Sequence, residues 1–332
     1  MRQLYVAEHE VQAVTRPDRT DGEITVPGGV AELEGHPVWL DLREADGLAR
    51  LDDVDRPCHL ELNHVVLVDD RIRARIAALA RAQVIELVGA GLSDADLALV
   101  AELEALRGLR LLAPAITEAG LQRLGSLTEL RRLDLSYSGI GDEGLRWLHR
   151  APHLRELDLR ATRVTDAGFA HLAALTDLEE LLLYRDRFEP LSDQPFGDAA
   201  IVHLRSLRRL RLLVLANGAV TDVGVESLRE LTSLEHLNVR GNPITDAGLR
   251  HIGGMTRLVQ LNLEETRITD AGLAQLSGLT SLEALALGET ATTDAGLVHL
   301  EPLMALRHLI FGFQVSMEAR ARFRREHPLL QD

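Results

Sequence analysis

The apolar positions of this chain fall into a repeat of fixed length. When segments that read Leu-x-x-Leu-x-Leu, or a close variant, are aligned on their middle leucine, they follow one another at intervals of 24 residues, with a single interval of 32. The aligned positions are Ile85, Leu109, Leu133, Leu157, Leu181, Leu213, Leu237, Leu261, Leu285 and Leu309. The sequence therefore predicts ten units in register, with one insertion of eight residues (32 − 24).

Each unit contains two hydrophobic periods. In the unit 258–281, Leu261 and Leu263 alternate with polar residues, which is the period of a short strand with one buried face. Leu273, Leu276 and Leu279 then recur at every third position, which places them along one side of a helix or a 3₁₀ segment. We therefore expect one strand and one short helix in every unit.

Polar residues and glycines mark the junction between strand and helix. Thr269 can cap the helix by accepting from its first amides, and Asp270 places negative charge at the positive end of the helix dipole. The pair recurs as Thr165-Asp166, Thr221-Asp222, Thr245-Asp246 and Thr293-Asp294. Glycines share one register after the cap, where the missing Cβ lets consecutive helices pack closely: Gly120, Gly144, Gly168, Gly224, Gly248, Gly272 and Gly296. Small polar residues after the strands are expected to satisfy turn amides from inside the stack: Ser138, Thr162, Asn242, Thr266 and Thr290.

These residues resemble the leucine-rich-repeat family, and specifically its short repeats with an Ile-Thr-Asp-x-Gly-Leu block, as in F-box-associated and bacterial GALA-like proteins. The block stands here at Ile268 to Leu273, and the resemblance covers roughly residues 82–311. It implies an α/β solenoid, a horseshoe with a parallel β-sheet on the concave face and short helices on the convex face. The N-terminus has no F-box-like helical segment, so the ubiquitin-ligase role of the F-box relatives is not carried over. The function that the resemblance implies for this chain is therefore only the binding of a partner.

The two ends are expected to close the stack, because exposed apolar edges invite polymerisation. We predict an N-terminal cap over residues 1–35 as a β-hairpin, the solenoid over 36–315, and a charged capping helix in 316–332. Within the solenoid, Val38 to Leu42, Leu60 to Leu62 and Arg71 to Ala80 are predicted to form less regular early repeats.

The outward side chains of the strands should form rows that are open to a partner. Apolar members of these rows form one candidate contact patch: Leu182, Tyr184, Leu212, Val214 and Ala216. The insertion at 184–197 adds Phe188 and Phe196, and an aromatic loop on a rigid scaffold is a usual place for recognition. The alternative is that Phe188, Leu191 and Phe196 fold back over the patch and only cover an irregular junction.

A charged group of strand residues lies next to that patch in the sequence: Arg132, Asp134, Glu156, Asp158 and Arg160. Their alternating sign allows ion pairs between adjacent strands, with modest energy at an exposed surface. This group is either a solvated face or a means of orienting a partner, in which case Asp134, Asp158 and Arg160 are contact residues.

Composition narrows the kind of partner. The net charge of −15 repels nucleic acid and anionic membranes and favours a neutral or basic protein or peptide. Cys58 is the only cysteine, which excludes an internal disulfide and indicates a reducing compartment, with Cys58 a small buried hydrophobe. The acids in Met1 to Glu10 do not fit a signal peptide, and no segment reaches the roughly 20 apolar residues of a membrane span. We expect a cytoplasmic protein, and the use of arginine and alanine fits a bacterial source.

No motif for catalysis or cofactor binding is found, and neither a phosphate-binding glycine loop, a Gly-x-Ser-x-Gly elbow nor a His-Glu-x-x-His pair occurs. Four histidines share one helix register, namely His171, His203, His251 and His299. Only the first two belong to consecutive units, so we predict no metal site and exposed positions on the convex side. The sequence thus favours a protein- or peptide-binding scaffold without cofactors. The alternatives are an acidic inhibitor or immunity protein for a basic enzyme, an enzyme or enzyme subunit with a site in the N-terminal region or the insertion, and an architectural spacer.

Overall fold

The computed structural model describes residues 38–41, 58–63 and 82–88 as backbone strands, and residues 93–112, 115–185 and 196–331 in full. The described residues form two compact parts, one ending at Leu178 and one beginning at Glu179. Several predictions lie outside the described residues: the hairpin cap at 1–35, the helix at 71–80, the side chain of Cys58, and the centre of the insertion with Phe188 and Leu191.

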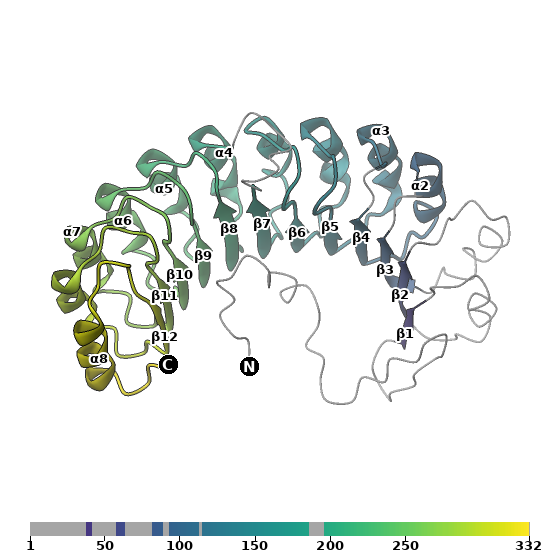
Figure 1. The fold of residues 1–332 in the computed structure, drawn as a ribbon. Coiled ribbons are helices and arrows are strands. Elements are labelled where there is room, and N and C mark those ends of the chain that lie inside the picture. The colour runs from purple at the N-terminus through teal and green to yellow at the C-terminus, as the bar shows by residue number, and fades with distance from the viewer. Residues whose placement is uncertain are drawn as a thin grey trace. The chain divides into compact units, whose positions relative to one another are not determined.

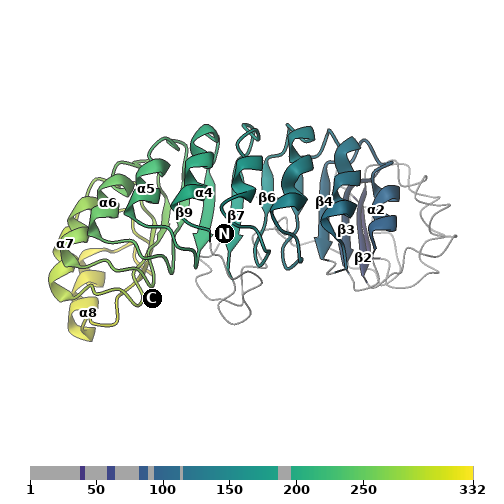
Figure 2. The same ribbon diagram turned by 90° about the horizontal axis from the view of Figure 1, so that it is seen from above.

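The first part is a row of parallel strands in chain order, and from β3 onward a helix of one repeat lies between consecutive strands (Figures 1 and 2). Its strands are β1 (Val38–Asp41), β2 (Cys58–Asn63), β3 (Ala82–Val88), β4 (Gly108–Leu112), β5 (Arg132–Asp134) and β6 (Glu156–Asp158). Its described helices are α2 (Asp94–Val100), α3 (Glu118–Leu121) and the 3₁₀ segments η4 (Gln122–Ser126), η5 (Asp142–Arg150) and η6 (Gly168–His171).

The second part repeats the same plan. Its strands, again parallel and in chain order, are β7 (Glu180–Tyr184), β8 (Leu212–Ala216), β9 (His236–Asn238), β10 (Gln260–Asn262), β11 (Ala284–Ala286) and β12 (His308–Ile310). Its helices are α4 (Asp198–Val202), η7 (His203–Ser206), α5 (Asp222–Leu228), α6 (Asp246–Ile252), α7 (Asp270–Leu273), η8 (Ala274–Leu276), η9 (Asp294–Leu300) and α8 (Met317–Glu326). Within each part the strands lie on the concave side and the helices on the convex side (Figure 1).

The register of the strands confirms the repeat. Leu109 pairs with Leu133 and Leu133 with Leu157, so the aligned leucines lie directly opposite one another. Leu181 pairs with Leu213 even though 32 residues separate them. The extra residues of that unit therefore lie between β7 and α4 and do not shift the sheet.

The core consists of the two sets of periodic leucines. Leu261 and Leu263 are buried while the polar residues beside them are half-buried, and Leu273, Leu276 and Leu279 are all fully buried. Burial of one leucine contributes about 1.5–3 kcal/mol. Because each unit contributes several, stacking on its neighbours stabilises a unit that has no closed core of its own.

The junction between strand and helix has one feature that the sequence predicts and one that it does not. As predicted, the hydroxyls of Thr221, Thr245, Thr269 and Thr293 each accept a hydrogen bond from the amide two residues later and cap the helix. The following aspartate does more than face the helix dipole. The carboxylate of Asp246 accepts from both the amide and the hydroxyl of Thr269 in the next repeat, at 2.8 and 2.6 Å.

This bond between repeats recurs in both parts and, where it occurs, links the start of one helix to the start of the next. Asp94, Asp142, Asp198, Asp222, Asp270 and Asp294 make the same pair of bonds to Thr117, Thr165, Thr221, Thr245, Thr293 and Ser316. The glycine register follows from it. A Cβ on Gly272 would lie 2.2 Å from Asp246 Oδ1, so the close packing predicted at these glycines leaves room for a carboxylate.

The small polar residues after the strands are only partly as predicted. The hydroxyls of Ser138, Thr162, Thr266 and Thr290 donate to the carbonyl oxygen three residues before them, so they satisfy carbonyls and not amides. Asn242 does both: it accepts from the amide of Val220 at 3.0 Å and donates to the carbonyl of Leu215 at 2.6 Å. The expected satisfaction of turn amides is therefore right for Asn242 alone among these five.

Candidate partner-binding surface

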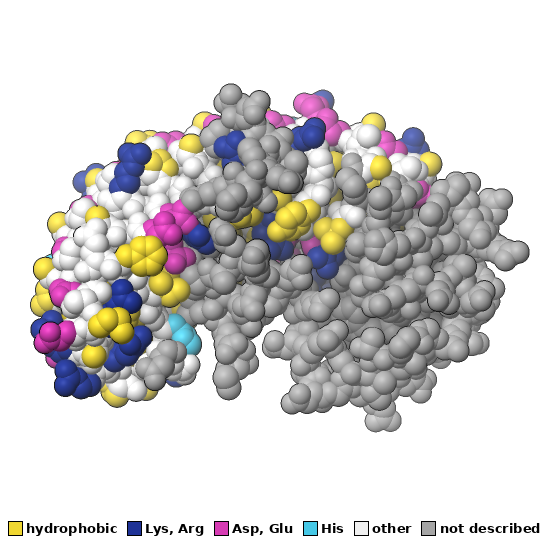
Figure 3. All heavy atoms as spheres, viewed as in Figure 1, with side chains coloured by type: hydrophobic (Ala, Val, Ile, Leu, Met, Phe, Trp, Pro, Cys, Tyr) yellow, Lys and Arg dark blue, Asp and Glu magenta, His cyan; other side chains and the backbone are white. Residues whose placement is uncertain are grey.

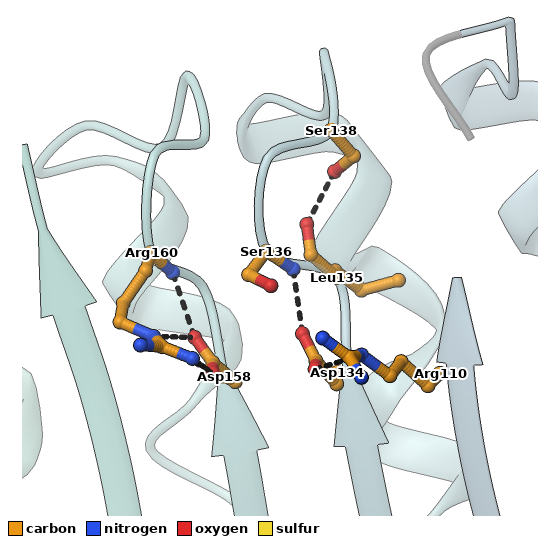
Figure 4. Close-up of polar contacts among 7 residues, drawn as sticks. All are labelled: Arg110, Asp134, Leu135, Ser136, Ser138, Asp158 and Arg160. Carbon is orange, nitrogen blue, oxygen red and sulfur yellow. Dashed lines mark hydrogen bonds and ion pairs between the residues drawn. The ribbon is translucent and has the colours of Figure 1, made fainter. Parts of the chain in front are cut away.

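The ends of β5 and β6 are shaped by aspartates that bind their own backbone. Asp134 Oδ1 accepts from the amide of Ser136 at 2.9 Å, and Asp158 Oδ1 accepts from the amide of Arg160 at 3.0 Å (Figure 4). In the second part Asn238 and Asn262 occupy the same position and accept from the amides of Arg240 and Glu264. The acid or amide at this position therefore ends the strand by closing a local turn.

The remaining carboxylate oxygen of each aspartate faces an arginine. Asp134 Oδ2 lies 2.9 Å from Nε of Arg110 on the adjacent strand β4, an arginine outside the group for which the sequence predicts ion pairs. Arg132 and Glu156 make another such pair at 2.8 Å. Asp158 instead pairs with Arg160 on its own chain segment, with Arg160 Nε 2.8 Å from Oδ2. Figure 4 shows the Arg160 side chain folded back along the strand end onto Asp158.

The Asp158–Arg160 pair is buried, and this corrects the expected exposure of the charged group. Asp134, Asp158 and Arg160 are 8%, 3% and 5% exposed. Burial raises the pKa of the Asp158 carboxyl above its ordinary value, and the hydrogen bond and charge of Arg160 oppose that rise without cancelling it. Burial lowers the pKa of Arg160, but the hydrogen bond and charge of Asp158 outweigh this and raise it. These three residues therefore hold the strand ends in shape and are not themselves a solvated face.

Two residues that the sequence does not single out, Ser136 and Tyr137, follow β5 in the chain. The Ser136 side chain is 1% exposed, and its hydroxyl has no hydrogen-bond partner among the described residues. A buried hydroxyl without a partner costs about 1–3 kcal/mol, so such groups are exceptions in folded proteins.

Tyr137 follows Ser136 and is 60% exposed. Its φ is 56°, in the left-handed region, and its amide donates to the carbonyl of Arg160 at 2.8 Å. The left-handed turn recurs at Ala161, Asn217, Gly241, Glu265 and Glu289, so it belongs to the repeat, and the tyrosine is this unit's own addition. Glycine and asparagine at the equivalent positions are the sequence signal that marks this turn.

In the second part, the predicted apolar patch is smaller than expected. Leu182, Ala216 and Phe196 are buried, at 3%, 2% and 4% exposed, whereas Tyr184, Leu212 and Val214 are half-buried. Leu182 lies opposite Val214 and Tyr184 opposite Ala216 in the pairing of β7 with β8. The prediction that Leu182 and Ala216 stand exposed was therefore wrong.

The end of the insertion is anchored on the next repeat. The carbonyl of Phe196 accepts from the amide of Ala219 at 2.8 Å, and a Cβ on Gly218 would lie 2.4 Å from the Phe196 ring. Phe196 thus packs against Gly218 of the next repeat and is 4% exposed. Phe188, which was predicted to act with it, lies outside the described residues.

The shared register of the histidines brings no metal ligands together. His171, His203, His251 and His299 are on the helical side and half-buried, so they are less exposed than predicted. Over the described ranges, no group of three or more His, Cys, Asp or Glu side chains could hold a metal ion. None of the helices in those ranges is long and apolar enough to span a bilayer.

Comparisons with known proteins agree with the repeat and the fold. Family models described as leucine-rich repeats match residues 208–268, and 126–146 with 150–173. A search of curated proteins gives no match. The matched residues are leucine-rich repeats, and each part of the chain has the fold of an α/β solenoid with a parallel sheet and short helices. The finer resemblance to F-box-associated and GALA-like repeats is not among these matches.

Among solved structures, the chain is similar to two internalins of Listeria monocytogenes. The internalin InlF is 22% identical with a TM-score of 0.61, over 81% of this chain and 71% of that one. Internalin C2 is 20% identical with a TM-score of 0.49, over 73% of this chain and 84% of that one. The likeness to InlF supports the fold alone.

Proposed function

We propose that this protein is a binding scaffold that holds a protein or peptide on its strand face, the face of the sheet turned away from the helices. The observation that carries the proposal is Tyr137, a 60% exposed aromatic residue held on a fixed left-handed turn at the end of β5. Leucine-rich repeats generally bind other proteins in this way, and exposed tyrosines on rigid supports are frequent anchors of interfaces.

The contact residues that we propose are accessible residues of the strands and of the turn that follows β5. In the first part they are Tyr137, Arg132 and Glu156, since the side chains of the last two are 58% and 32% exposed. In the second part they are the half-buried Tyr184, Leu212 and Val214. Asp134, Asp158 and Arg160 act by fixing the turn that presents Tyr137.

The narrower alternative, an acidic inhibitor or immunity protein for a basic enzyme, predicts a bare acidic surface. On the described strands β4 to β6, acids instead pair with arginines, as in Arg110–Asp134 and Arg132–Glu156. Such internally neutralised pairs give little long-range attraction. A salt titration separates the two: our proposal predicts that affinity falls only modestly with salt, and the inhibitor predicts a steep fall.

The proposal is tested with a partner recovered from cells of the source organism and then purified. Its affinity is measured for the wild type, for an R132E/Y137A variant of the strand face, and for an R123E/R150E variant on the helical side, where both arginines are exposed. We expect at least about a tenfold loss for the strand-face variant, as for the loss of an interface anchor, and no more than about twofold for the helical one. Equal affinities of the two variants would contradict the proposal.

A further inference from the structure

The C-terminal end of the solenoid carries a surface that the strand face does not include. We propose that this end surface, made of Phe313, Met317, Arg320, Arg322, Arg324 and Arg325, docks a short acidic peptide segment that also carries apolar side chains. This peptide-docking site is independent of the partner-binding function proposed for the strand face.

The apolar half of the end surface consists of the two most exposed large hydrophobic residues in the described chain. Phe313 is 73% exposed and Met317 is 75% exposed. Arg320, one turn after Met317 on α8, donates from Nε to the carbonyl of Val315 and from its terminal nitrogen to that of Gly312, both at 3.0 Å. These bonds tie the loop that carries Phe313 to the helix that begins with Met317. The two exposed side chains are therefore held on one framework.

The charged half consists of the four arginines of α8. Arg320 and Arg325 donate hydrogen bonds to backbone carbonyls. None of the ion pairs in the described part of the chain includes an arginine of α8. The guanidinium groups of Arg320 and Arg324 lie over the ring of Phe311, each 5.5 Å from its centroid. Nε of Arg324 is buried and has no hydrogen-bond partner among the described residues. Arg320, Arg324 and Arg325 are thus held by contacts that do not include a carboxylate.

The nearby acids do not cancel this charge. Glu318 and Glu326 lie on α8, and Asp294 is engaged with the amide and hydroxyl of Ser316 at 2.6 and 2.7 Å. The hydrogen bonds from Ser316 and the charges of Arg322 and Arg320 lower the pKa of Asp294, so this carboxylate offsets part of the positive charge. The four arginines still outnumber these three acids, on a chain whose net charge is −15. Figure 3 shows Lys and Arg side chains gathered over this end with hydrophobic side chains among them.

The charge of the whole chain decides which anionic partner fits. A duplex or a bilayer is extended, so it would also meet the acidic repeats and be repelled by them. A short peptide touches only the end surface, and at a Debye length of about 8 Å the rest of the chain is screened from it. Acidic side chains would pair with the arginines, and apolar ones would cover Phe313 and Met317.

The test measures fluorescence anisotropy of a short fluorescein-labelled peptide made of Asp, Glu and Leu, titrated with the full-length chain. A peptide with Asn and Gln in place of the acids is the neutral control. The variants are R322E/R325E, whose two arginines are exposed, and F313S. R250E/R267E, at exposed arginines elsewhere in the same part, changes the net charge equally and is the matched control.

We expect saturable binding of the acidic peptide that weakens as salt is added, and no binding of the neutral one. R322E/R325E should weaken binding about tenfold and F313S about threefold, while R250E/R267E and the strand-face variant R132E/Y137A stay within about twofold of wild type. Absence of acidic-peptide binding by a wild type that circular dichroism shows to be folded would overturn the proposal. So would an equal loss in R250E/R267E, or binding to phosphatidylglycerol vesicles without binding to the peptide.

Discussion

Asp222 on α5 binds Thr245 of the next repeat through two hydrogen bonds, from the threonine amide at 2.8 Å and from its hydroxyl at 2.6 Å. The same hydroxyl accepts from the amide of Ala247 and caps α6. One carboxylate thus fixes both the start of the next helix and its distance from the previous one. Because this contact recurs along the chain, it sets the spacing of the solenoid on the helical side.

Removal of this carboxylate should therefore loosen the stack. We predict that Asp222→Ala lowers the free energy of unfolding by about 1–3 kcal/mol, because a helix cap loses its support and two donors lose their acceptor. Urea unfolding followed by circular dichroism measures the change. Glu226→Ala, which removes only an exposed pair with Arg229 at 3.5 Å, is the control and should stay within about 0.5 kcal/mol. Equal losses in the two variants would show that the contact between repeats has no special weight.

The glycine that accommodates this carboxylate should resist a methyl group. A Cβ at Gly248 would lie 2.5 Å from Asp222 Oδ1 and 2.9 Å from Ile244 Cγ2, so Gly248→Ala should cost about 1–3 kcal/mol. Gly139 has no atom within 4 Å of its Cβ position, and Gly139→Ala should be close to neutral. In a double-mutant cycle, Asp222→Ala should reduce the cost of Gly248→Ala. Additive costs would contradict a steric conflict with the carboxylate.

The buried Asp158–Arg160 ion pair predicts that the effects of two substitutions on the free energy of unfolding do not add. Asp158→Asn keeps the acceptor for the Arg160 amide, as Asn238 does in its own repeat, but leaves the Arg160 charge without its carboxylate. We expect a cost of about 3–5 kcal/mol, and we expect the double variant with Arg160→Leu to regain part of it, since no unpaired charge is then buried. Guanidinium-induced unfolding of the three variants measures this, and a double variant less stable than Asp158→Asn would contradict it.

The left-handed turn predicts that glycine is better than alanine at an exposed position. Glu289 has a φ of 54°, and both Glu289→Ala and Glu289→Gly remove its charge. Because only the glycine relieves the backbone, the Gly variant should be more stable than the Ala variant by about 1 kcal/mol. Thermal unfolding of the pair decides this, and the reverse order would show that the turn is not strained.

Two glutamates predict opposite dependence of stability on pH. Burial raises the pKa of Glu264 above its ordinary 4.5, so the ionised group costs stability as the pH rises above that value. The hydrogen bond from Arg211 lowers the pKa of Glu235, so that group contributes stability that is lost as the pH falls through its lowered pKa. Glu264→Gln should therefore be more stable than wild type at pH 7, and Glu235→Gln less stable. Both differences should vanish in acid, and persistence of either at low pH would contradict its assignment.

The sequence alone predicts the fold because the fold is encoded in local periods. The aligned leucines determine the strand register, and Thr269 and Gly272 mark the start and packing of a helix within their own unit. The candidate surface is harder to predict because exposure depends on side chains from neighbouring strands. Asp158 and Arg160 read as a solvated pair, yet the arginine folds back and both are buried. Tyr137 was missed because its prominence comes from a backbone turn, visible in sequence only through Gly241 and Asn217 at equivalent positions.

The claim that the strand face holds the partner is tested most directly by photo-crosslinking in the cells of the source organism. A benzophenone amino acid replaces Tyr137 in one strain and Arg123, exposed on η4 of the helical side, in another. We predict a discrete covalent adduct with a second protein from position 137 and none from position 123. An adduct from position 123 with none from position 137 would contradict the account.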